Sequence, residues 1–152
     1  FCEVVRHLRA EDGCPWDRAQ THTSLKPYCI EEAAEVIGGI NIWEATGDAE
    51  NLKEELGDLM LQILLHAQIA EEEGLFTIRE VMDGASEKMI RRHPHVFGKS
   101  MLSEQGEPVT DWDAIKKQEK AGKEWTEADL PGALEEAGKL LERAKERKGI
   151  KK

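Results

Sequence analysis

The sequence predicts an all-α protein with a four-helix-bundle core that assembles into an oligomer. Apolar residues recur every three or four positions in several long segments, and no segment shows the alternating pattern of a strand. Proline, glycine and capping residues separate these segments, as expected at helix ends. The 152 residues are enough for one domain with a real core. We expect this domain over residues 1–130, followed by a basic C-terminal helix over residues 131–152.

The N-terminal segment predicts one short helix. Residues 3–10 have helical periodicity, and the following Glu11-Asp12-Gly13 is typical of a helix end. Residues 14–17, Cys-Pro-Trp-Asp, predict a turn.

The next helix carries stronger signals at its start than at its end. Ser24 is a suitable N-cap and Pro27 is expected in the first turn. Gly38-Gly39 is expected to loosen the far end, so that residues 43–48 form a connector. A central helix then follows over residues 49–73 and ends at Gly74, a residue type favoured after a helix C-terminus.

The central helix is apolar on more than one side, which predicts that it is buried on most of its surface. One set of residues is expected to fill the core of its own subunit, namely Leu56, Leu59, Ile63 and Ala67. A second set is expected to pack against another subunit, namely Leu61, Leu64, Leu65 and Ile69. Glutamate substitution of Leu61 or Leu65 is accordingly expected to weaken a dimer.

Four further signals predict the rest of the chain. Residues 77–80, Thr-x-x-Glu, form a capping box that begins a fourth helix, and Pro94 prevents its continuation. Residues 99–110 are rich in Gly, Ser and Glu and predict a mobile loop. Asp111-Trp112 begins a short helix, and Pro131 suits the first position of a last one.

Two acidic motifs are the most informative feature of the chain. They are Glu31-Glu32-x-x-Glu35 and, after nineteen intervening residues, Glu55-x-x-Asp58. At about 100° per residue, Glu35 lies roughly 40° from Glu31 and roughly 60° from Glu32, and Glu55 lies roughly 60° from Asp58, so each motif occupies one side of a helix. If the two helices face each other, four or more carboxylates meet and need a cation between them. An all-oxygen site of this kind suits Mg²⁺, with Mn²⁺ as a substitute.

A solvated acidic face is the alternative reading, because Glu is a good helix former. The apolar surroundings of the second motif argue against it. Around the helix axis, Glu55 and Asp58 point into the sector between Leu59 and Leu65, on a helix that is apolar round most of its circumference. Half-buried carboxylates need partners, and one metal ion serves several of them.

A basic segment ends the fourth helix. Lys88, Arg91 and Arg92 precede His93-Pro94-His95. These cations complement the partial negative charge of a helix C-terminus. They could also bind the phosphates of a triphosphate, whose charge metal ions alone do not neutralise. We interpret the two histidines as loop residues that do not bind metal.

Composition excludes several classes of function. The formal net charge of -10 argues against binding to nucleic acid. The chain has no charged leader and no run of about eighteen apolar residues, so we expect a soluble cytoplasmic protein with no membrane partner. Its three cysteines are expected to be reduced and not to bind zinc. The C-terminal twenty residues carry seven basic and four acidic side chains, which predicts a solvated basic helix.

Taken together, the motifs resemble the MazG family of nucleoside triphosphate pyrophosphohydrolases. The resemblance includes the two acidic motifs, the run from Lys88 to His-Pro-His-Val-Phe, the Gly-Cys-Pro-Trp-Asp segment at residues 13–17, and Trp112-x-x-Ile-Lys. It covers about residues 5–120. It implies an all-α dimer or higher oligomer and Mg²⁺-dependent hydrolysis of nucleoside triphosphates to monophosphate and pyrophosphate, with a role in nucleotide-pool house-cleaning.

The resemblance also implies roles for individual residues. The metal ligands would be Glu32, Glu35, Glu55 and Asp58. Glu31 would lie outside the direct ligands or orient a water molecule. The substrate-binding residues would be Lys88, Arg91, Arg92 and Trp112, with the cations on the phosphates and Trp112 stacked on the base or ribose.

Alternatives remain open at this stage. Relatives specific for dUTP or phosphoribosyl-ATP share the acidic helices, and a non-catalytic helical module that binds nucleotide or mediates oligomerisation would share the same pattern. The sequence does not determine the base and sugar preference, the attacked phosphorus or the number of metal ions.

Overall fold

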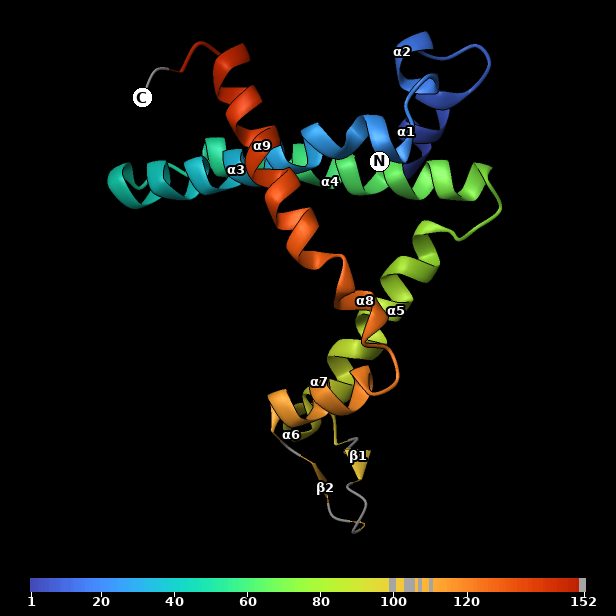
Figure 1. The fold of residues 1–152 in the computed structure, drawn as a ribbon. Coiled ribbons are helices and arrows are strands. Elements are labelled where there is room, and N and C mark those ends of the chain that lie inside the picture. Colours follow the sequence, from blue (N-terminus) through green and yellow to red (C-terminus); the bar gives the residue numbers. More distant parts are fainter. Residues whose placement is uncertain (99–100, 103–105, 107, 110, 151–152) are drawn as a thin grey trace. The chain divides into compact units, whose positions relative to one another are not determined.

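The computed structural model describes residues 1–98, 101–102, 106, 108–109 and 111–150. Its chain divides into two compact units, one formed by Phe1–Ile78 with Ala133–Lys152 and the other by Arg79–Gly132. The described residues form helices and one pair of two-residue strands (Figure 1). The prediction of an all-α fold is confirmed.

Two long helices dominate the first unit. These are α3 (His22–Thr46) and α4 (Glu50–Glu72), which lie antiparallel and side by side (Figure 1). The shorter helices α1 (Cys2–Arg9) and α2 (Pro15–Arg18) precede them. The C-terminal helix α9 (Leu130–Arg147) joins this unit from Ala133 onward.

The start of α3 differs from the prediction. Thr21 is the N-cap, with its hydroxyl accepting from the Ser24 amide at 3.1 Å, and the Ser24 hydroxyl accepts from the Thr21 amide at 2.9 Å. This reciprocal capping box satisfies two backbone donors, so the helix begins two residues before Ser24. Pro27 therefore lies inside the helix instead of in its first turn.

The end of α3 also differs, because the helix continues through Gly38-Gly39 and includes residues 43–46 of the predicted connector. Gly39 is buried, and a Cβ atom added there would lie 2.8 Å from the Leu52 Cα atom of α4. Gly39 thus marks a close approach of two helices and not a weak helix end. The helix ends at Gly47, whose φ of 79° is the left-handed conformation that glycine adopts without a Cβ clash.

The core of the first unit lies where α1, α3 and α4 meet. Its buried apolar cluster is formed by Val5, Leu25, Leu64, Leu65 and Ile69. Beside it the Arg9 guanidinium, only 6% exposed, forms a bidentate ion pair with Glu72, with N–O distances of 3.0 and 2.7 Å. This pair links α1 to the end of α4.

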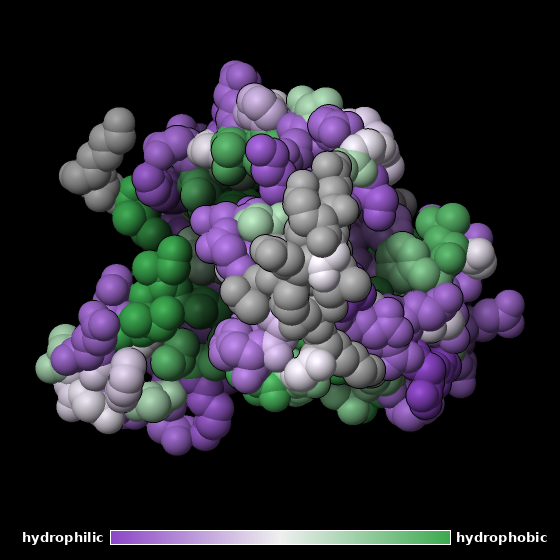
Figure 2. All heavy atoms as spheres, turned by 90° about the horizontal axis from the view of Figure 1, so that it is seen from below, coloured by the Kyte–Doolittle hydropathy of each residue, from purple (hydrophilic) through white to green (hydrophobic). Residues whose placement is uncertain are grey.

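The burial of the two apolar faces of α4 differs from the prediction, except that Ala67 is buried as expected and Leu59 is half-buried. Leu64, Leu65 and Ile69, expected at a subunit interface, are buried in the core of this chain, and Leu61 packs against them. By contrast, Leu56, Met60 and Ile63 are 49%, 52% and 50% exposed. Helical periodicity identifies both faces but does not indicate which one α1 and α3 cover. Apolar residues are exposed in patches among hydrophilic ones on the face shown in Figure 2.

The second unit contains the remaining elements. They are α5 (Ile78–Arg92), which enters this unit at Arg79, α6 (Pro94–Phe97), β1 (Met101–Leu102), β2 (Pro108–Val109), α7 (Trp112–Lys120) and α8 (Trp125–Ala128). The strands pair antiparallel within the predicted loop 99–110, much of which lies outside the described residues. As predicted, Asp111 caps α7, accepting from the Ala114 amide at 2.8 Å. The sequence did not predict α2, α6 or α8.

Among the described residues, no helix is both long and apolar enough to cross a membrane. The three cysteines form no disulfide among the described residues.

The glycine pair offers a test of the α3–α4 contact. Gly39→Ala is expected to destabilise the protein by about 1–3 kcal/mol, because the new methyl group would press on the Leu52 backbone. Gly38→Ala is the matched control, since a Cβ atom there meets nothing within 4 Å. It should stabilise by roughly 0.5–1 kcal/mol through helix propensity. Urea unfolding measures both, and equal stabilisation by the two substitutions would contradict the close contact.

Candidate functional site

Three carboxylates from the two long helices meet in the first unit. Glu32 and Glu35 of α3 and Glu55 of α4 each offer an oxygen, and these oxygens lie within 4.8 Å of one another. All three side chains are half-buried. No other group of metal-binding side chains meets this spacing in the part of the chain that the structure describes. The antiparallel pairing of α3 and α4 thus brings the two acidic motifs together.

Burial and like-charge crowding both act on the pKa of Glu32. Burial, followed by the nearby charges of Asp58 and Glu55, raises the pKa of Glu32 above its ordinary value. Asp58 is therefore close to the cluster although it is more exposed and lies outside the group of three. A divalent cation among these oxygens would relieve the repulsion, and the all-oxygen donor set fits a hard cation.

Asn51 is a contributor to the site that the sequence analysis missed. Its amide Nδ2 donates to Glu55 Oε1 at 2.8 Å from one turn earlier on α4. The i, i+4 spacing of the two residues was the available signal. This hydrogen bond orients the Glu55 carboxylate relative to the two glutamates of α3.

Glu31 lies apart from the three clustered carboxylates and has a cation of its own. It is 7% exposed and forms an ion pair with Arg147 of α9. The adjacent Lys148 forms an ion pair with Glu35. The C-terminal segment, predicted to be a solvated basic helix, is exposed over most of its described residues but also pairs with the acidic motif of α3. Glu31 and Arg147 are 116 residues apart in the sequence, so no local sequence pattern indicates that they pair.

A row of polar side chains continues from the acidic cluster between α3 and α4. The Cys29 sulfur lies 3.2 Å from His66 Nε2, and His66 Nδ1 lies 2.7 Å from His22 Nδ1. Burial, and then the charge of Glu32, raises the pKa of the Cys29 thiol. Burial, and then His22, lowers the pKa of His66, which favours a neutral imidazole at neutral pH. These contacts satisfy polar groups between the helices.

The predicted substrate-binding residues all belong to the second unit. Arg91 Nε and Arg92 Nη2 lie 3.1 and 2.7 Å from the Glu119 carboxylate. Arg92 also covers the Trp112 ring, with 5.2 Å from its Cζ atom to the ring centroid. Burial works to raise the pKa of Glu119, but Arg92 and Arg91 together bring it below its ordinary value. The approach of Lys88, Arg91, Arg92 and Trp112 to the carboxylates stays a prediction.

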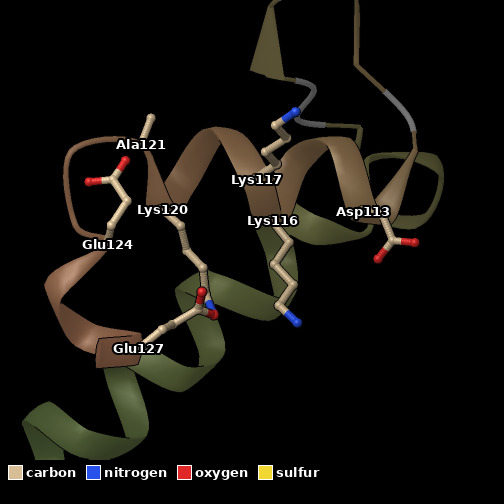
Figure 3. A pocket seen from close by; sticks show the side chains of 7 residues that line it. All are labelled: Asp113, Lys116, Lys117, Lys120, Ala121, Glu124 and Glu127. Carbon is tan, nitrogen blue, oxygen red and sulfur yellow. The ribbon is translucent and has the colours of Figure 1, made fainter. Parts of the chain in front are cut away.

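The second unit has a pocket of its own on α7, with a volume of about 430 Å³. Its charged lining consists of Asp113, Lys116, Lys117, Lys120, Glu124 and Glu127 (Figure 3). Lys120 pairs with Glu127 across it. The three lysines and three carboxylates of this pocket balance in formal charge.

Comparison with known proteins agrees with the acidic cluster. Residues 20–97 match the sequence profile of the MazG nucleotide pyrophosphohydrolase domain. This range contains both acidic motifs and the basic segment that ends α5.

Curated relatives cover most of the chain. It is 52% identical over 120 residues to a Thermotoga maritima protein named nucleoside triphosphate pyrophosphohydrolase/pyrophosphatase MazG, with 79% of the chain and 44% of that protein covered. It is 40% identical over 134 residues to the Escherichia coli K12 nucleoside triphosphate pyrophosphohydrolase, with 86% of the chain and 49% of that protein covered. It is also 48% identical over 145 residues to the uncharacterized protein YabN of Bacillus subtilis, with 92% of the chain and 29% of that protein covered. The chain thus spans half or less of the length of these relatives.

Proposed function

Because the chain belongs to the MazG family of nucleotide pyrophosphohydrolase domains, we propose that it hydrolyses nucleoside triphosphates to nucleoside monophosphate and pyrophosphate with Mg²⁺. The observation that carries this proposal is the cluster of Glu32, Glu35 and Glu55. The names of the Thermotoga and Escherichia coli relatives support the class of reaction. Removal of unwanted triphosphates from the nucleotide pool is the role that we propose for it in the cytoplasm.

The cluster residues would hold Mg²⁺, with Asp58 joining Glu32, Glu35 and Glu55. Bound Mg²⁺ would activate water and neutralise phosphate oxygens. The protein's own part is to position charges, because phosphoryl transfer requires little covalent chemistry from side chains. Asn51 fixes the Glu55 carboxylate, and the antiparallel helices fix its distance from Glu32 and Glu35. In the second unit, Lys88 and Arg92 would bind phosphates and Trp112 would stack on the base.

Product analysis tests the reaction. With Mg²⁺ and a mixed set of nucleoside triphosphates, we expect monophosphate and pyrophosphate in equal amounts and no turnover in excess EDTA. Anion-exchange chromatography separates these products from diphosphate and orthophosphate. Diphosphate as the main product, or full activity in EDTA, would refute the proposed reaction. Absence of turnover with any triphosphate would favour a module that binds nucleotide or mediates oligomerisation.

Removal of single charges tests the metal ligands. Glu35→Gln and Asp58→Asn should each lower turnover by about a hundredfold or more, since even the outer partners of metal ligands change affinity or activity by roughly 10- to 100-fold. Without metal, each variant should melt at the same temperature as the parent or slightly higher, because a repelling charge has been removed. Mg²⁺ should raise the melting temperature of the parent by binding the folded state, and raise it less in the variants.

Glu54→Gln is the matched control, an exposed glutamate on the same helix outside the cluster. It should keep the turnover and the Mg²⁺ response of the parent. If Mg²⁺ stabilises Asp58→Asn as much as the parent, Asp58 is not a ligand.

We also propose that the chain forms a homodimer or a dimer of dimers through the exposed face of α4. Leu56, Met60 and Ile63 follow one another at helical spacing on this face, each about half exposed. Leu56 and Met60 line a shallow groove of about 460 Å³ together with Leu52 and Gly57. A second subunit would cover this apolar surface in an isologous contact.

Substitutions on the exposed face of α4 test the proposed dimer. Met60→Glu and Ile63→Glu should weaken assembly at micromolar concentration and leave the helical content unchanged. Leu61→Glu and Leu65→Glu, expected from the sequence to act on the interface, would instead disturb the core of the subunit. Leu75→Glu is the control, because Leu75 is 63% exposed outside this stripe. Light scattering measures assembly and circular dichroism measures helical content. A fully active monomer would contradict the proposal.

A further inference from the structure

The C-terminal part of α9 is packed against α3 by more than its charges. Ala144 is 6% exposed, and Leu140 and Leu141 are half-buried on the same side of the helix. Near the other end of the contact, Lys26 Nζ lies 3.0 Å from the Glu136 carboxylate. The C-terminal part of α9 crosses α3 (Figure 1), and the side chains of Arg147 and Lys148 reach the acidic motif of α3.

Two neighbouring cations reach two carboxylates of that motif. Arg147 pairs with Glu31 and Lys148 pairs with Glu35. The influence of Lys148 extends to Glu32, whose pKa it acts to lower. Both basic side chains remain about half exposed, at 55% and 42%, so they are accessible to a ligand.

Occupation of the cluster by a divalent cation would change these contacts. Glu35 cannot direct the same oxygen fully at both the cation and Lys148. A cation held by Glu32, Glu35 and Glu55 would also repel the Lys148 ammonium group, which would leave that group free to bind another anion. A long lysine side chain can make this change by rotating its own torsions, while α9 remains packed through Leu141 and Ala144.

The structure leaves room for such an anion. A pocket of about 370 Å³ lies between α3 and the end of α9, within the size range of small-ligand sites. Its charged lining consists of Glu31, Glu35, Lys145 and Lys148, and its apolar wall includes Ala34, Leu141 and Ala144. The pocket therefore adjoins the acidic cluster and combines two lysines and two carboxylates with an apolar wall.

We propose that Lys148 and Arg147 bind the phosphates of the substrate, replacing their carboxylate partners with phosphate oxygens when metal and nucleoside triphosphate enter the site. The proposal rests on the proposed function for the identity of the ligand. Lys148 and Arg147 belong to the same unit as the acidic motif, and they already pair with its carboxylates. Arg91 and Arg92, the cations indicated by the sequence, are hydrogen-bonded to Glu119 in the second unit.

The competing explanation is that the two cations only neutralise the acidic motif when no metal is bound. The two explanations predict opposite signs for the effect of Lys148→Gln on a phosphate ligand. If Lys148 is only a counter-ion, its loss leaves triphosphate affinity unchanged or strengthens it. If Lys148 binds phosphate, its loss weakens triphosphate affinity although Mg²⁺ alone binds more tightly.

Isothermal titration with α,β-methylene analogues of ATP, GTP, CTP and UTP at saturating Mg²⁺ tests the proposal. Lys148→Gln and Arg147→Gln should each raise the Kd of the bound analogues by about tenfold, the loss expected for one charge-assisted hydrogen bond. Lys148→Arg should restore the affinity to within a few-fold of the parent. Lys139→Gln is the control, since Lys139 pairs with Glu135 within α9 and is 66% exposed outside the pocket.

Unchanged or tighter analogue binding in both glutamine variants would overturn the proposal and leave the cations as counter-ions. If the parent binds none of the analogues, the proposed function fails and this inference fails with it. If the parent binds them and Lys148→Gln weakens binding as expected, the phosphate role stands even where product analysis shows diphosphate.

Discussion

The close contact between α3 and α4 at Gly39 is the constraint on which the site depends. Glu35 lies one turn before Gly39, and Glu55 lies three residues after the Leu52 backbone that Gly39 touches. A side chain at Gly39 would separate the helices at this level, because Cβ would lie 2.8 Å from Leu52 Cα. Carboxylate oxygens within 4.8 Å of one another require the smaller separation that glycine permits.

Bringing these carboxylates together creates an electrostatic problem, and the chain meets it with cations from its other end. The raised pKa of Glu32 shows that burial and its neighbours oppose ionisation. Arg147 and Lys148 compensate part of this charge through Glu31 and Glu35. The contact of α9 with α3 is therefore a consequence of the acidic site as well as of apolar packing. A metal ion and a phosphorylated ligand would redistribute the same charges.

Local signals in the sequence predicted helices well and their partners poorly. The ends of α4 and the cap of α7 at Asp111 follow from single residues whose backbone preferences act locally. Gly39 is compatible with two predictions, because glycine weakens a helix but also permits two helices to pack closely. The choice between Leu61 and Met60 as the buried residue of α4 depends on what α1 and α3 cover, which periodicity does not contain.

By itself, the sequence determined the all-α class and the two acidic motifs, because helical spacing places Glu32 beside Glu35 on any α-helix. It also determined the family, since the order of motifs along the chain is a property of sequence. Only the tertiary structure decided that Glu55 joins those two glutamates, that Asn51 orients it, and that Lys148 lies at Glu35. The physical reason is distance along the chain: the pairing of α3, α4 and α9 depends on which surfaces are buried together, and residues far apart in sequence carry no local mark of it.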